Sequence, residues 1–134
     1  MDVQILYGIE EIKKIYETSL QAGKIDFICF SKKYSEIIGD YFDKNYAPRL
    51  YNSRIVTREI LPRNQGNEEV IEKKMGKNQN RYVSLQKSSE SDLMIFSSRA
   101  VLISYNAQTP YAITITDKQL VANLENQFAL LWER

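Results

Sequence analysis

The segment Ile25–Phe30, with the sequence IDFICF, is the clearest structural signal in this chain of 134 residues. It is short, almost wholly apolar and rich in residues that favour strands, which is typical of a strand buried on both faces of a sheet. A strand buried in this way needs helices on both sides of its sheet. The segment therefore indicates an α/β fold.

The sequence before this strand predicts a strand followed by a helix. Val3–Leu6 is a short apolar run that fits an edge strand, and Gly8 interrupts it. Apolar residues then recur at three- and four-residue steps as far as Leu20, which predicts one apolar stripe on a helix. Gly23 is expected to end that helix.

The sequence after this strand predicts a second helix and a third strand. We expect Ser31 to cap a helix whose apolar stripe runs from Tyr34 to Tyr46, and Pro48 to end or kink it. Ser53–Leu61 predicts the strand. Residues 63–80 form the most polar stretch and predict a surface excursion, with one helical turn near residues 70–75.

The last third predicts closely spaced strands and a C-terminal helix. Thr116 with Gln119 forms a capping box for this helix, whose apolar side contains Leu120, Leu124 and Phe128. The order β-α-β-α-β, then antiparallel strands and a helix, predicts a mixed sheet flanked by helices in one domain of residues 1–134. The four expected strands are Arg81–Leu85, Leu93–Phe96, Ala100–Tyr105 and Tyr111–Thr116.

Composition limits the class of protein. The chain is 43% hydrophobic and 26% charged, which is typical of a globular domain. It contains neither an apolar run long enough to span a membrane nor a secretory signal, so we expect a cytoplasmic protein without a membrane partner. The single cysteine, Cys29, lies in an apolar run and is interpreted as a buried, inert thiol.

The absence of histidine restricts the chemistry most strongly. Without an imidazole, the chain has no histidine base, no Ser-His or Cys-His pair and no histidine ligand for a metal. One cysteine excludes a thiolate zinc site, and neither of the common phosphate-binding glycine motifs is present. We therefore expect no catalysis, no metal and no cofactor.

A basic middle third provides the candidate binding residues. Residues 44–87 carry ten basic and four acidic side chains, although the net charge of the whole chain is only +1. Arginine suits carboxylate and phosphate groups, so we expect a small, anionic effector near the tyrosines of this segment. The alternative is a solvated face whose arginines pair with Glu59, Glu68 and Glu69. The candidate ligand-binding residues are Arg49, Tyr51, Arg54, Arg58 and Tyr82.

The opening stretch YGIEEIKKIYETSL (residues 7–20) and the closing stretch ITITDKQLVANLENQFALLWER (residues 113–134) resemble the regulatory domains of TrmB-like transcriptional regulators. Their domain commonly begins with G-I-x-x-I-K-x-I-Y and ends with F-x-x-L-W, and Arg49–Ile60 and Leu93–Ser104 resemble the segments between. The resemblance implies a phospholipase-D-like fold and a DNA-binding winged helix in a separate domain. The matching positions are Gly8, Ile9, Ile12, Lys13, Ile15 and Tyr16, then Phe128, Leu131 and Trp132.

The chain departs from this family in two respects. Nothing before Gly8 is long enough for a winged helix, so we expect contact with DNA only through a domain outside this chain. In addition, the stretch SDLMIFSSRAVLIS lacks the histidine and lysine that phospholipase-D-like enzymes use before their late hairpin. The resemblance thus implies the fold without phosphodiester chemistry, and it does not extend to binding of maltose-like sugars.

Three functions remain open at this point. The first is a non-catalytic domain that senses a ligand or forms a dimer within a TrmB-like regulator. The second is a stand-alone interaction module that forms a homodimer through the last helix or an uncovered face of the sheet. The third, which the sequence favours least, is a degenerate phosphodiesterase-like enzyme.

Overall fold

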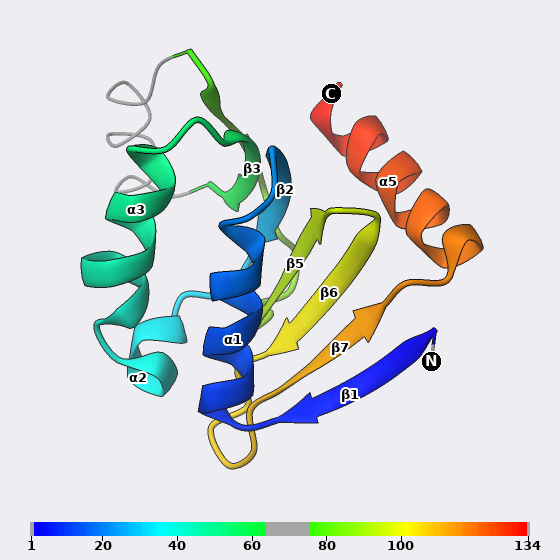
Figure 1. The fold of residues 1–134 in the computed structure, drawn as a ribbon. Coiled ribbons are helices and arrows are strands. Elements are labelled where there is room, and N and C mark those ends of the chain that lie inside the picture. The colour runs from blue at the N-terminus through cyan, green and yellow to red at the C-terminus, as the bar shows by residue number, and fades with distance from the viewer. Residues whose placement is uncertain (1, 64–75, 134) are drawn as a thin grey trace.

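The computed structural model describes residues 2–63 and 76–133 of the chain. Its elements are β1 (Val3–Tyr7), α1 (Ile9–Ser19), β2 (Lys24–Cys29), α2 (Tyr34–Ile38), the π-helical segment η1 (Tyr41–Tyr46), α3 (Ala47–Tyr51), β3 (Val56–Pro62), β4 (Asn78–Val83), β5 (Ser91–Phe96), β6 (Arg99–Ser104), β7 (Tyr111–Ile115) and α5 (Lys118–Trp132). Helices α1, α2 and α3 lie on one side of a central sheet, and α5 lies on the other (Figure 1).

The sheet is mixed, as the sequence predicts. Its seven strands follow the order β1-β7-β6-β5-β2-β3-β4. Strands β2, β3 and β4 are parallel, whereas β5, β6, β7 and β1 are added to β2 in antiparallel fashion. The predicted α/β class is therefore confirmed. One detail differs, because the strand expected at Arg81–Leu85 begins at Asn78 and joins the parallel half rather than the antiparallel meander.

Strand β2 is buried on both faces, as its sequence indicates. Ile25 and Phe27 are 0% and 1% exposed and belong to the core beneath α1, α2 and α3. Ile28 is also buried, but it belongs to the second core beneath α5. Alternate residues of one strand thus supply two separate hydrophobic cores, because successive side chains of a strand point to opposite faces.

The family-like positions at both ends are structural. Gly8 adopts a φ of +98°, a conformation that favours glycine, and its N–H donates to the Pro110 carbonyl as α1 begins. Tyr16 is buried in the core beneath α1, while Phe128 and Trp132 are buried beneath α5. Both motifs therefore fix helices to the sheet.

The prediction of one helix from Tyr34 to Tyr46 is wrong. Gly39 breaks it with a φ of +65°, and the chain continues as η1 and then α3. Pro48 does not end the helix, because it lies in the first turn of α3, where a proline removes no hydrogen bond. Ser31 does not cap α2 either, since Lys33 occupies that position.

Three further boundaries differ from the predictions. Strand β3 begins at Val56 rather than Ser53, whose hydroxyl donates to the Leu50 carbonyl at the end of α3. Asp117 caps α5 in place of Thr116, because its carboxylate accepts the Leu120 N–H at 3.0 Å. The Leu120 side chain is exposed, and the buried side of α5 contains Val121, Phe128 and Trp132.

Most of the predicted surface excursion, including the helical turn near residues 70–75, lies outside the described residues. Among the residues that are described, no helix is long and apolar enough to cross a membrane.

Candidate functional site

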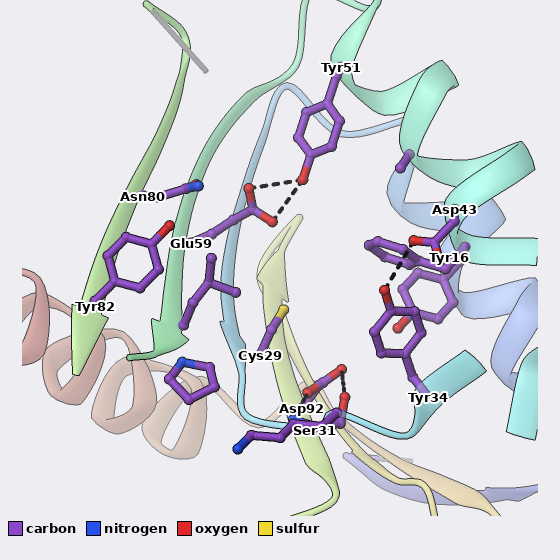
Figure 2. A pocket seen from close by; sticks show the side chains of 15 residues that line it. Tyr16, Cys29, Ser31, Tyr34, Asp43, Tyr51, Glu59, Asn80, Tyr82 and Asp92 are labelled. Carbon is purple, nitrogen blue, oxygen red and sulfur yellow. Dashed lines mark hydrogen bonds between the residues drawn. The ribbon is translucent and has the colours of Figure 1, made fainter. Parts of the chain in front are cut away.

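A cleft of about 620 Å³ opens on the side of the sheet that α1, α2 and α3 cover. It lies where β2, β3 and β4 reach their carboxyl ends, with β3 and β4 on one wall and the helices on the other (Figure 2). Ligands of open α/β sheets commonly bind at this edge. The lining residues are Tyr16, Cys29, Ser31, Lys32, Tyr34, Phe42, Asp43, Ala47, Tyr51, Glu59, Leu61, Pro62, Asn80, Tyr82 and Asp92.

On the strand side of the cleft, the Glu59 carboxylate accepts hydrogen bonds from a tyrosine and an asparagine. Glu59 is only 4% exposed, and the Tyr51 hydroxyl donates to both of its oxygens at 2.9 Å. The Asn80 amide, oriented with its nitrogen toward acceptors, donates to Glu59 Oε2 at 3.1 Å. Burial raises the pKa of Tyr51 far above its usual value, and the charge of Glu59 raises it further. Tyr51 therefore stays protonated and remains a donor.

A second buried carboxylate, Asp92, lies at the base of the cleft. It is 6% exposed and accepts hydrogen bonds from the Ser31 N–H at 3.0 Å and the Ser31 hydroxyl at 2.9 Å. Burial raises the pKa of Asp92 to about 6, with a further contribution from the charge of Glu90, while the bonds from Ser31 oppose the shift. Ser31 therefore positions this carboxylate rather than capping a helix.

Aromatic rings form the helix side of the cleft. The Tyr34 hydroxyl donates to Asp43 Oδ1 at 3.0 Å, and burial is the main cause that raises the pKa of Tyr34. The buried Tyr16 packs against Tyr46 with ring centroids 4.8 Å apart and shares a hydrogen bond with the Tyr105 hydroxyl. These contacts give the wall a rigid aromatic surface.

Cys29 is not fully buried, contrary to the sequence-based interpretation. It is the last residue of β2, and its thiol lies in the middle of the cleft, between Glu59 and Asp92 (Figure 2). Its neighbours in sequence are apolar, but the cleft opens at the end of the strand and leaves the residue half-buried.

The five predicted binding residues do not come together. Tyr51 and Tyr82 line the cleft, but none of the three arginines does. Arg54 is exposed in the loop before β3. Arg49 is exposed on α3 and forms a bidentate pair with Glu17 of α1, at 2.9 and 3.0 Å.

Arg58 projects from the opposite face of the sheet. Its Nε and Nη2 donate to the two oxygens of Asp26, both at 2.9 Å. The guanidinium carbon lies 4.9 Å from the ring centroid of Phe128 and 5.5 Å from that of Trp132. Arg58 therefore links the sheet to α5. The alternative in which the arginines form ion pairs gains support, but with different carboxylates, and Glu68 and Glu69 lie outside the described residues.

Sequence reasoning missed Glu59 and Asp92 as cleft residues. The available signal is an acidic residue inside an apolar strand pattern, as in SRIVTREIL and SDLMIF. A carboxylate in such a position must meet donors when the strand is buried. The resulting site supplies acceptors, hydroxyl groups and aromatic faces. Residues 2–63 and 76–133 contain no cluster of three or more side chains suited to bind a metal.

Comparison with known proteins identifies the fold. Neither the models of protein families nor the curated proteins give a match. The structure of TrmBL2, described as an archaeal chromatin protein with a novel mode of DNA binding, is similar with a TM-score of 0.64 and 15% identity; the match covers 99% of this chain and 53% of that chain. NucT from Helicobacter pylori is similar with a TM-score of 0.64 and 8% identity, over 98% of this chain and 95% of that one. The chain spans about half the length of TrmBL2. The predicted likeness to TrmB-like proteins is thus confirmed for the fold.

Proposed function

We propose that this chain is a non-catalytic effector domain of a TrmB-like transcription regulator and that it binds a small molecule in the cleft. The observation that carries the proposal is a cleft of about 620 Å³ lined by two carboxylates, Glu59 and Asp92, that are almost fully buried. Ligand pockets are commonly of this size and contain a few polar groups among apolar ones. The fold shared with TrmBL2 supports the regulatory role.

The lining favours a ligand that donates hydrogen bonds. Among residues 2–63 and 76–133, the lining contains three carboxylates, on Asp43, Glu59 and Asp92, and one basic residue, Lys32. An anion at this place would be repelled, whereas an amine or a polyol would find acceptors and aromatic faces. The ligand class proposed here therefore differs from the anionic effector that the basic middle third suggests.

The two walls of the cleft offer a way to transmit binding. Tyr34 projects from α2 and Tyr51 from α3 on the helix side, while Tyr82 projects from β4 on the strand side (Figure 2). A ligand that contacts both walls stabilises the arrangement in which the helices lie close to the sheet. In a regulator, this shift in population is what a dimer or a DNA-binding domain would sense.

The proposal is tested by thermal-shift titration with putrescine as a diamine, myo-inositol as a polyol and inorganic phosphate as an anion. We expect the melting temperature to rise with putrescine or myo-inositol, and the rise to shrink in Tyr51→Phe and Asp92→Asn. Tyr111→Phe is the matched control, because Tyr111 packs against Tyr7 and does not line the cleft. An equal response of Tyr51→Phe and the wild type to both probes would contradict the proposal.

The catalytic alternative is tested separately with bis(p-nitrophenyl) phosphate. The proposal predicts no turnover that depends on Glu59 or Asp92. Hydrolysis that is lost in Glu59→Gln and retained in Tyr111→Phe would instead support a phosphodiesterase.

Edge strand β1 favours a second function, homodimer formation. Val3, Ile5 and Tyr7 are 41%, 50% and 62% exposed, and the strand carries no charge between residues 3 and 7. Exposed edges of this kind pair with other strands, and two copies of β1 could pair antiparallel across a two-fold axis. Sedimentation of the wild type and Ile5→Lys at micromolar concentration tests this idea. A substitution in the last helix such as Phe128→Glu is unsuitable for testing a dimer surface on that helix, because Phe128 is 0% exposed and the change would disturb the core.

A further inference from the structure

A second, smaller cavity of about 180 Å³ lies on the same face as the cleft but at the other end of the sheet. The cleft adjoins the pair Cys29 and Asp92, whereas Phe96 and Arg99 close the β5–β6 hairpin at the opposite end. Side chains from β1, α1, β5, β6 and β7 surround the cavity. They include Gln4, Lys14, Thr18, Phe96, Arg99 and Thr114.

The hairpin turn fixes the position of Arg99. Ser97 and Ser98 have φ values of +48° and +59°, which is the conformation of a tight two-residue turn between antiparallel strands. This turn places Arg99 directly opposite Phe96 in the register. The guanidinium carbon of Arg99 lies 5.5 Å from the centroid of the Phe96 ring. Stacking on a ring leaves the N–H groups at the guanidinium edge available for other acceptors.

Two polar atoms at this cavity are buried without a partner. Among residues 2–63 and 76–133, Arg99 Nε and Thr114 Oγ1 are shielded from solvent and have no hydrogen-bond partner. Buried polar groups are normally satisfied, so each exception needs an explanation. Arg49 and Arg58 contrast with Arg99, because each forms a bidentate pair with a carboxylate.

We propose that this cavity binds one tetrahedral oxyanion, phosphate or sulfate, with Arg99 as its charged anchor. The Thr114 hydroxyl is a second donor to the ion. Lys14 and Glu11 also line the cavity, and their charges offset each other because Lys14 Nζ lies 3.2 Å from Glu11 Oε1. A cavity of about 180 Å³ is smaller than the pockets that hold drug-sized ligands, and a single small ion suits it better. This inference goes beyond the proposed effector site and stands independently of what the cleft binds.

NMR titration with sodium phosphate and sodium sulfate, against sodium chloride at matched ionic strength, tests the proposal. We expect saturable shifts of the Arg99 Nε–H and Thr114 amide signals. Arg99→Gln should weaken binding at least about tenfold, since it removes the charge and the fork of donors. Arg99→Lys should bind with intermediate affinity, because it keeps the charge and loses the planar fork.

Two further variants keep the result decisive. Arg54→Gln is the matched control, because Arg54 is an exposed arginine that lines neither cavity, and its affinity for phosphate should equal that of the wild type. Thr114→Val keeps the side-chain shape and should weaken binding by about threefold through loss of one hydrogen bond. Linear shifts without saturation, or equal affinity of Arg99→Gln and the wild type, would overturn the proposal.

Discussion

The two faces of the sheet hold charge in different ways. Beneath α5, the Asp26 carboxylate meets Arg58, and the pair is covered by Phe128 and Trp132. Beneath the other helices, Glu59 receives hydroxyl and amide donors beside an open cleft. Arg58 and Glu59 are consecutive in β3. One step along the strand therefore separates the ion pair of Arg58 with Asp26, which we call the clamp, from a residue that lines the cleft. The clamp holds α5 to the sheet, whereas Glu59 lines the cleft.

The largest expected effect concerns the clamp. Arg58→Ala should lower the free energy of unfolding by about 3 kcal/mol, because the buried carboxylate of Asp26 loses both hydrogen bonds from the guanidinium and the contact with α5 is removed. Lys24 Nζ, 3.9 Å from Asp26 Oδ2, would compensate only in part, because the Lys24 side chain is exposed. Denaturation in urea measures the loss. The affinity for putrescine or myo-inositol should be unchanged in the fraction that stays folded, since Arg58 does not line the cleft.

Arg49→Ala is the matched control for the clamp. Its pair with Glu17 has side chains that are 50% and 44% exposed, so solvent screens the interaction. The free energy of unfolding should fall by less than about 1 kcal/mol. Equal losses for the two arginine variants would contradict the distinction between the faces.

The next effect is the pH dependence that Asp92 confers. Its pKa in the folded protein is about 6, above the value of about 3.9 expected in the unfolded chain. The folded state therefore binds the proton more tightly, and stability should fall by about 2 to 3 kcal/mol as the pH rises from about 4 to 6. Asp92→Asn should remove this part of the pH dependence. Denaturation at several pH values measures it, and a carboxyl carbon that titrates in NMR below about 4.5 would refute it.

The smallest effect concerns the donor to Glu59. Tyr51→Phe should lower the free energy of unfolding by about 1.5 kcal/mol at neutral pH, because the buried carboxylate loses a hydrogen bond while the ring remains. Tyr111→Phe should change it by less than about 0.5 kcal/mol. Chemical denaturation compares the two variants, and an equally small change in both would show that Tyr51 does not hold the carboxylate.

Much of the fold follows from local patterns. The apolar run IDFICF is compatible only with a central position, and Gly8 and the aromatic residues of the last helix occur where helices meet the sheet. The region between Tyr34 and Tyr51 was harder to predict. Its apolar spacing is typical of one continuous helix and does not indicate the positive φ at Gly39 or the wider turn of η1. Spacing reports the apolar side of a helix, but it does not show where the helix is interrupted.

The site was less predictable than the fold, because it depends on which strands are neighbours. Arg58 meets Asp26 only through the parallel register of β2 and β3, in which these two residues are paired. Glu59 and Asp92 line the same cleft because β2 alone separates their strands in the sheet, although they lie far apart in sequence. Proximity in sequence grouped the arginines with the tyrosines of the basic segment. In the structure, alternation along β3 directs Arg58 to the face opposite Glu59, while Arg49 and Arg54 are exposed outside the cleft.

The pairing of β1 with β7 has a consequence for how the chain folds during synthesis. Val3 pairs with Ile115, so β1 must wait for a strand that is synthesised much later than itself. Contacts between such distant segments form slowly, because a long loop must close before they are gained. Until then, the uncharged strand β1 lacks its partner β7, and chaperones that bind exposed apolar segments would find it accessible.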